Sequence, residues 1–197
     1  MKLTRAVLLI ALPAGLAAQG QPPAQPSAFA LANPMATVFK NRTAGVRRNI
    51  IQALDSIPAS KYDFKPTPAQ LTIGYIAQHV ASDSYFFCNN LTDTKKTDPD
   101  AQTADSVKAK WPKDTLVSHL RAASAFCDDV FNQLSDAKIG EMMTVGQAPN
   151  TRQVPRINYA LGHAMDLADH YSQLANYMRL NGLIPPTALP RPGRGGN

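Results

Sequence analysis

The segment from residue 155 to residue 181 constrains the fold of this chain more than any other. Apolar residues recur within it at intervals of three and four, and Gly182 follows it with Pro185 and Pro186, which together predict one long helix. The apolar residues are Ile157, Ala160, Leu161, Ala164, Leu167, Ala168, Tyr171, Leu174, Ala175 and Met178. A helix with one apolar side must bury it against other elements, so this segment requires a packed domain.

A second row of residues runs beside the apolar one, again at intervals of three and four. It consists of His163, Asp166, His170, Gln173 and Tyr177. A helix needed only for packing would not usually carry a row of ligand-type side chains along the edge of its buried side. Asp166 and His170 lie one turn apart and can hold one metal ion together. The sequence therefore predicts a site on this helix.

The same helical periodicity predicts three further helices. They span residues 34 to about 56–58, about 68 or 72 to 90, and about 114 to 135. Asn33 is the predicted cap of the first helix and Asp114 that of the third. Segments 91–113 and 136–154 are polar and show no alternating pattern, so no strand is predicted. Four amphipathic helices favour an all-α four-helix bundle, and connections of this length do not force a simple up-and-down order.

The two ends of the chain have compositions that predict segments outside the bundle. Lys2 and Arg5 precede the apolar run 6–18, which is typical of a secretory signal peptide and is short for a membrane span. We therefore expect residues 1–18 to be cleaved and the protein to be exported. The Gln/Pro/Ala/Ser-rich residues 19–32 are a predicted linker, residues 33–186 the bundle, and residues 187–197 a disordered tail.

The distribution of charge narrows the classes of binding partner. The formal net charge is +6, but the basic residues are scattered and show no stripe with interleaved aromatics, so we expect no nucleic-acid partner.

The residues alone leave two interpretations of Cys88 and Cys127: one disulfide, or two small buried apolar side chains. Parallel second and third helices would bring them to similar heights. A thiol-redox role is a third, weaker hypothesis that requires free, reactive thiols.

The histidines suggest where a metal would bind. His79 lies among the apolar residues of the second helix, so His79, Asp166 and His170 could supply two nitrogens and one carboxylate oxygen. That donor set suits Zn, Ni, Fe(II) or Mn and leaves room for a water of lowered pKa. The competing interpretation is that these histidines are hydrogen-bonded core residues. His163 lies two turns from His170 and is the candidate proton carrier. His119 is predicted to lie at the surface or at the rim of the core.

Motifs spread over residues 35–186 resemble the DinB/YfiT-like superfamily of four-helix bundles. They are Leu54-Asp-Ser-Ile-Pro58, Asp63-Phe-Lys-Pro66, Leu71-Thr-Ile-Gly74-Tyr-Ile-Ala-Gln-His79-Val80, Tyr85-Phe-Phe-Cys88, Asp169-His170-Tyr-Ser-Gln173-Leu174, Tyr177-Met-Arg179 and Gly182-Leu-Ile-Pro185-Pro186. The resemblance implies an up-down-down-up bundle, in which the second and third helices are parallel. It also implies a divalent metal held by a histidine of the second helix and an HxxxH pair of the fourth, at positions 79, 166 and 170.

The chain departs from the family pattern at one of these positions, because Asp166 stands where the resemblance places the first histidine of the pair. A carboxylate can also bind a metal, and its presence equally suits a site that has been lost. The leading hypothesis is an exported metal-dependent hydrolase of an unknown small molecule, with His163 carrying a proton and Tyr171 or Gln173 orienting nearby groups. The alternative is a non-catalytic binding or stress-related bundle. The resemblance also suggests a homodimer.

Overall fold

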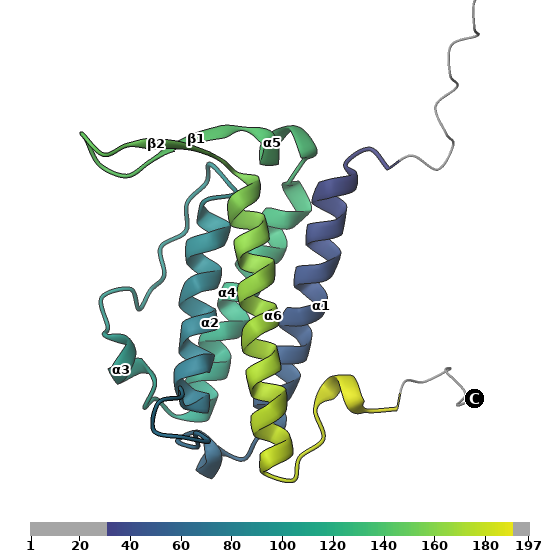
Figure 1. Ribbon diagram of the computed structural model, residues 1–197, viewed down its shortest axis with the longest axis vertical. Helices are drawn as coiled ribbons and strands as arrows, with labels where there is room; N and C mark the ends of the chain where they lie inside the picture. The colour runs from purple at the N-terminus through teal and green to yellow at the C-terminus, as the bar shows by residue number, and fades with distance from the viewer. Residues whose placement is uncertain (1–30, 191–197) are drawn as a thin grey trace, which may run out of the picture. The chain divides into compact units, whose positions relative to one another are not determined.

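The computed structural model describes residues 31–190. Its core consists of four long helices, α1 (Pro34–Ser56), α2 (Ile73–Asn89), α4 (Lys113–Gln133) and α6 (Ile157–Leu180) (Figure 1). The predicted four-helix bundle is therefore confirmed, with helix ends within a few residues of those expected. The predicted signal peptide 1–18, most of the predicted linker 19–32, and tail residues 191–197 lie outside the described residues.

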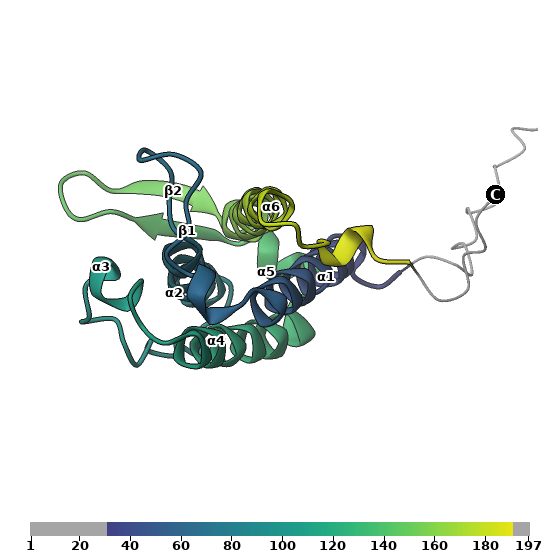
Figure 2. The ribbon, with the colours of Figure 1, turned by 90° about the horizontal axis from the view of Figure 1, so that it is seen from below.

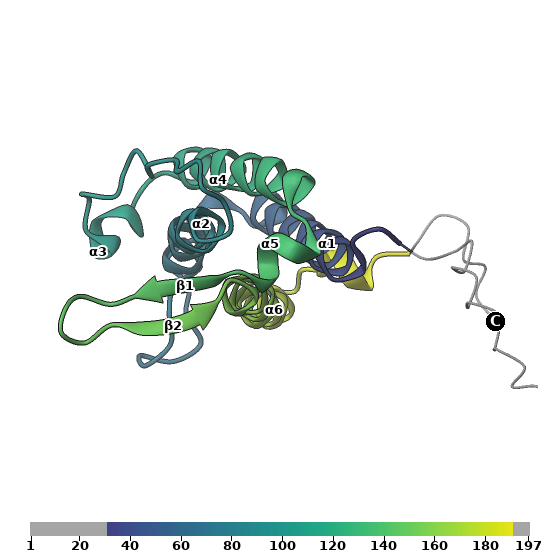
Figure 3. The ribbon, with the colours of Figure 1, turned by 90° about the horizontal axis from the view of Figure 1, so that it is seen from above.

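The helices follow the up-down-down-up order that the resemblance implies. In Figure 1, α1 and α6 run downwards while α2 and α4 run upwards. Seen along the bundle in Figures 2 and 3, α2 packs between α4 and α6, and α1 closes the ring between the same two helices. Parallel neighbours need a connection that returns along the bundle. Residues 90–112 supply it between α2 and α4, and they include the short helix α3 (Asp105–Lys108).

A disulfide between Cys88 and Cys127 joins the parallel helices α2 and α4, with their Cα atoms 5.5 Å apart. Parallel packing makes this pairing possible because each cysteine lies past the middle of its helix. The structure thus selects the disulfide from the two interpretations left open by the sequence. Both cysteines are fully buried, which excludes them as thiols that meet a substrate and ends the thiol-redox hypothesis in that form.

The start of α1 is capped by a residue far away in the sequence. Asp136, the first residue of α5 (Asp136–Gly140), accepts hydrogen bonds from the backbone N–H groups of Met35 (3.2 Å) and Ala36 (2.8 Å). Asn33 does not cap its own helix as predicted, because its side-chain oxygen accepts from the N–H of Asp136 instead (3.0 Å). This exchange satisfies free N–H groups of both helices and fixes α5 to the end of the bundle. Asp114 lies in the first turn of α4 rather than at its cap, because that helix starts one residue earlier.

A two-stranded hairpin lies between α5 and α6, where no strand was predicted. Its strands are β1 (Met142–Val145) and β2 (Arg152–Pro155), antiparallel with Met142 opposite Pro155. The prediction was wrong because strands of four residues are too short to establish an alternating pattern. Arg156 fixes the hairpin to the bundle, since its guanidinium donates to the Asp93 carboxylate (2.7 Å) and the Asn90 carbonyl (3.0 Å).

The buried side of α6 differs from the predicted apolar stripe. Leu167 and Leu174 are fully buried, but so is His163, whereas Leu161 is 49% exposed. The buried side is therefore rotated towards the row that carries the histidines. His163 lies beside the disulfide and His170 packs against the ring of His79 on α2.

The bundle is completed by two short 3-10 helices, η1 (Ala59–Lys61) and η2 (Pro186–Ala188). The predicted tail begins at residue 187, but Thr187 belongs to η2 and its backbone N–H donates to the Tyr171 hydroxyl (3.1 Å). Of the helices in residues 31–190, none combines the length and apolar character needed to cross a membrane.

Gly74, in the first turn of α2, lies against the connection that leads to α4. A Cβ atom at this position would be 2.4 Å from the carbonyl oxygen of Ala109, a backbone atom that cannot move independently. We expect Gly74→Ala to lower the free energy of unfolding by about 1–3 kcal/mol, measured by urea denaturation.

Gly45, in α1, provides the matched control. A Cβ atom there would have no neighbour within 4 Å, so Gly45→Ala should raise the free energy of unfolding by about 0.5–1 kcal/mol through helix propensity. Equal effects of the two substitutions would contradict the close approach at Gly74.

Candidate metal site between α2 and α6

Two Asp/His pairs face each other across the antiparallel helices α2 and α6. His79 and Asp83 lie four residues apart on α2, and Asp166 and His170 lie four residues apart on α6. Residues at this spacing share one side of a helix, so each helix presents an acidic and an imidazole group to the other. The rings of His79 and His170 meet nearly at right angles, with centroids 4.7 Å apart.

Asp166 lies at the centre of the predicted ligand set. Its Oδ1 is 3.3 Å from Nε2 of His170 and 3.6 Å from Nε2 of His79. One ligating atom from each of the three residues lies within 4.8 Å of the other two. The structure thus brings the three residues together, although His79 is far from the other two in the sequence.

The spacing of these atoms fits shared coordination. Two ligands about 2.1 Å from one metal ion in tetrahedral geometry lie about 3.4 Å apart. The two Asp166 distances, 3.3 and 3.6 Å, bracket that value and exceed a normal N–H···O hydrogen bond of about 2.9 Å. Within residues 31–190, Oδ2 of Asp166 and Nδ1 of His170 are buried without a hydrogen-bond partner. The residues present therefore fit a divalent transition metal.

The site's electrostatics favour a charged carboxylate. Burial acts to raise the pKa of Asp166, but the neighbouring imidazoles of His170 and His79 outweigh it and lower that pKa overall. In turn, the neighbouring Asp166 carboxylate raises the pKa of His79 against the opposing effect of burial. The Asp166 side chain is 15% exposed and that of His170 is 8% exposed, so both lie at the floor of the site. His79, at 28%, lies nearer solvent.

Asp83 is the residue that sequence reasoning missed. Its Oδ2 lies 3.4 Å from Nε2 of His79, and burial raises its pKa. The signal that could have found it is its spacing, because Asp83 follows His79 by four residues just as His170 follows Asp166. It adds a second carboxylate to the site on the side nearer solvent.

His163, the predicted proton carrier, lies elsewhere. It is fully buried and belongs to a separate group with Cys88 and Cys127. Burial and the nearby Arg47 guanidinium lower its pKa to about 3, while Asp166 acts weakly in the other direction. A ring that is closed to solvent and neutral above pH 3 is poorly suited to exchange protons with a substrate.

The low pKa of His163 predicts a pH dependence of stability. Since the unfolded ring has a pKa near 6.5, the unfolded state binds more protons between about pH 6 and 4, and stability falls as the pH decreases. We expect the His163 contribution to fall by about 1.4 kcal/mol per pH unit in this window. The measurement is urea denaturation of the wild type and His163→Phe at several pH values. The difference between them should grow in favour of the variant as the pH falls, and parallel curves would contradict the assignment.

Three other sequence expectations are resolved by position. The Tyr171 hydroxyl is hydrogen-bonded to Thr187 (2.8 Å), and Gln173 donates to Asp169 (2.8 Å), so neither is directed at the three ligands. His119, predicted at the surface or rim, is instead buried at 6% exposure, with Nε2 2.9 Å from Oδ1 of Asp98. This contact fastens the long connection to α4.

Comparison with known proteins assigns the fold to a family. The family model of the DinB superfamily matches residues 42–174. The chain belongs to the DinB superfamily. No curated protein sequence matches this DinB member.

Solved structures share the DinB fold at low sequence identity. YfiT from Bacillus subtilis, described as a "probable metal-dependent hydrolase with an unusual four-helix bundle topology", is 13% identical, with a TM-score of 0.58 over 79% of this chain and 92% of YfiT. A DinB-like protein from Bacillus subtilis is 14% identical, with a TM-score of 0.56 over 74% of this chain and 92% of that protein.

The mycothiol-dependent maleylpyruvate isomerase is a third structural neighbour. It is 14% identical with a TM-score of 0.56, and the match covers 71% of this chain but only 60% of the isomerase. This DinB chain therefore matches only part of that enzyme. At these identities the structural comparisons support the fold.

Proposed function

We propose that this protein is a hydrolase that depends on a divalent transition metal held by His79, Asp166 and His170. The observation that carries the proposal is the pair of distances from Asp166 to the two imidazoles, which match the separation of ligands around one metal ion. The DinB fold is consistent with it, since one structural neighbour is described as a probable metal-dependent hydrolase. Zn, Ni, Fe(II) and Mn all suit this donor set.

Each residue of the site has its own proposed role in hydrolysis. A bound divalent metal would lower the pKa of a coordinated water and polarise a substrate oxygen. Asp166 and His170, at the floor, would hold the ion, and His79 would complete the set from the other helix. Asp83, on the side nearer solvent, is placed to accept a proton from a water molecule beside His79. A small-molecule substrate would approach from this side.

Substitution of Asp83 tests the catalytic part of the proposal. We expect the metal-loaded protein to hydrolyse at least one member of a panel of small esters, amides and phosphoesters. Asp83→Asn should lower kcat by on the order of 100-fold or more while the bound metal stays near one equivalent. Asp129→Asn, on the exposed side of α4, is the matched control and should leave kcat unchanged. Full activity of Asp83→Asn would remove Asp83 from the mechanism.

The alternative is a non-catalytic bundle in which Asp166 simply pairs with two histidines. The observation that favours it is that the Asp166 carboxylate lies within ion-pair distance of both imidazoles, so that protonated histidines would neutralise it without a metal. Melting with and without chelator separates the two functions, because a metal bound only to the native state raises stability by mass action. An unchanged melting temperature after chelation of metal-loaded protein would favour the non-catalytic bundle.

A further inference from the structure

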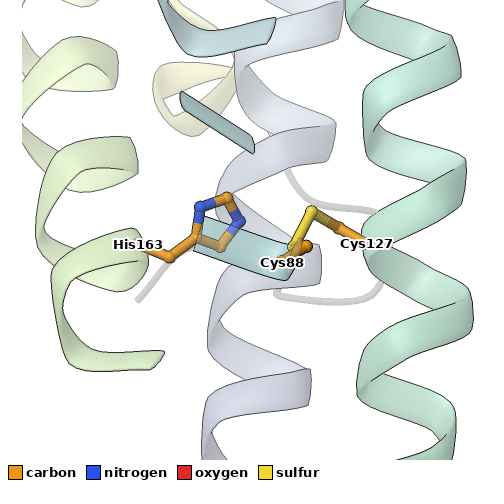
Figure 4. A group of neighbouring side chains, drawn as sticks. All are labelled: Cys88, Cys127 and His163. Carbon is orange, nitrogen blue, oxygen red and sulfur yellow. A yellow bond between two sulfur atoms is a disulfide. The ribbon is translucent and has the colours of Figure 1, made fainter. Parts of the chain in front are cut away.

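A second group of ligating side chains lies in the middle of the bundle, away from solvent. Cys88 of α2, Cys127 of α4 and His163 of α6 are each 0% exposed. Their two sulfur atoms and one imidazole nitrogen lie within 4.8 Å of one another. Figure 4 shows the His163 ring beside the Cys88–Cys127 disulfide. Three helices thus converge on one small volume with two sulfurs and one nitrogen.

The His163 ring is poorly satisfied where it lies. Within residues 31–190, its Nδ1 has no hydrogen-bond partner, and its Nε2 has only a long contact of 3.5 Å with Nη1 of Arg47. The rings of Phe87 and Phe131 pack against it. Burying a polar nitrogen without a partner lowers the stability of the fold, a cost that an apolar side chain would not incur. Packing and hydrogen bonding in the disulfide state therefore do not account for a histidine at this position.

We propose that reduction of the Cys88–Cys127 disulfide turns this group into a buried site for one Cu(I) ion, held by two thiolates and His163. Thiolates are soft ligands and select soft ions such as Cu(I). A copper(I) ion is satisfied by three donors, whereas structural zinc sites almost always use four. Three protein donors in a volume closed to water therefore match Cu(I) better than Zn²⁺.

The charge around the group supports the same ion. Two thiolates and Cu(I) carry a net charge of −1. The buried guanidinium of Arg47 lies against His163, and its acidic partner among the described residues is Asp128, which is half-exposed. A negative complex beside this cation is favourable, whereas two thiolates with Zn²⁺ would be neutral.

A dithiol reductant supplies the electrons and protons that open the disulfide before Cu(I) binds. The dithiol gives two electrons and two protons to the protein disulfide and becomes a cyclic disulfide itself. Cys88 and Cys127 are then thiols, and each loses its proton when Cu(I) binds, so two protons are released per ion. Reoxidation of the cysteines removes both thiolates and with them the site. This site does not depend on the proposed hydrolase function.

The test uses the full chain with His79→Ala and His170→Ala, so that the metal site between α2 and α6 cannot contribute. The protein is treated with a dithiol under native conditions without oxygen, and the two thiols are counted. It is then titrated against Cu(I) held by the coloured chelator bicinchoninate. We expect the reduced protein to withdraw one equivalent of Cu(I), and the disulfide form to withdraw none.

Two further variants make the test specific. His163→Phe should lower the Cu(I) affinity of the reduced protein by about tenfold or more, because it removes one of three ligands. His119→Phe replaces another buried histidine, outside the group, and should leave the affinity unchanged; circular dichroism checks that both variants stay helical. The proposal is overturned if the native disulfide resists the dithiol, if the reduced protein takes up no Cu(I), or if His163→Phe binds as tightly as the parent. Preferential binding of Zn²⁺ would overturn the choice of ion.

Discussion

His79→Ala and His170→Ala are each expected to weaken Zn²⁺ binding by on the order of 100-fold or more. Each substitution removes one of three ligands, and the remaining pair keeps only Asp166 and one imidazole. The measurement is competition with a chromophoric zinc chelator, using protein without an affinity tag. Both variants should stay folded, since each truncated ring lies at the border of the core.

His119→Phe tests the other partly exposed group of possible ligands, His119 with Asp98 and Asp100, which lies apart from the α2–α6 site. It should bind Zn²⁺ as the wild type does. If His79→Ala and His170→Ala also kept wild-type affinity while remaining helical, the metal would bind elsewhere and the ligand assignment would be wrong.

Replacing both cysteines, Cys88→Ala with Cys127→Ala, is expected to lower the free energy of unfolding by about 4 kcal/mol. The disulfide closes a loop with a sequence separation of 39 residues, and losing it restores the conformational freedom of that loop in the unfolded chain. Urea denaturation of the variant and of the oxidised wild type measures the difference.

Chemical reduction of the wild type is the control, since it opens the same loop without removing any sulfur atom. Reduction should lower the free energy of unfolding by most of the same amount. A variant within about 1 kcal/mol of the oxidised wild type would show that the disulfide is not what holds α2 and α4 together.

The bundle could be predicted from the sequence because each long helix carries a regular apolar row. Apolar periodicity placed all four helices, and prolines and glycine located several of their ends. The order of the helices came from the resemblance, because connections such as 90–112 are long enough for more than one topology.

The contacts that hold the connecting segments could not be predicted, because they join residues far apart in the sequence. His119 has polar neighbours along the chain, Ser118 and Arg121, which suggested the surface. On the helix, however, it shares the buried side with Leu116 and Leu120, and Asp98 receives its ring. In the same way, nothing near Asp136 in the sequence shows that it caps α1.

Only part of the candidate site could be predicted, because some of its residues are close in the sequence and others are not. The spacing of Asp166 and His170 is local and therefore visible in the sequence, and the resemblance placed His79 opposite them. His163 shares their row on the helix but faces a different pair of neighbours, α1 and the disulfide. Two turns along α6 thus separate the His170 ring, at the floor of the site, from the His163 ring in the closed core.

Elemental analysis is the decisive test of the metal site. It compares the wild type with the His79→Ala/His170→Ala double variant, both without an affinity tag. Both proteins are exposed to Zn, Ni and Mn salts and then desalted. We expect about one equivalent of a transition metal in the wild type and almost none in the double variant. A metal-free wild type, or a double variant that retains a full equivalent, would contradict the proposed site.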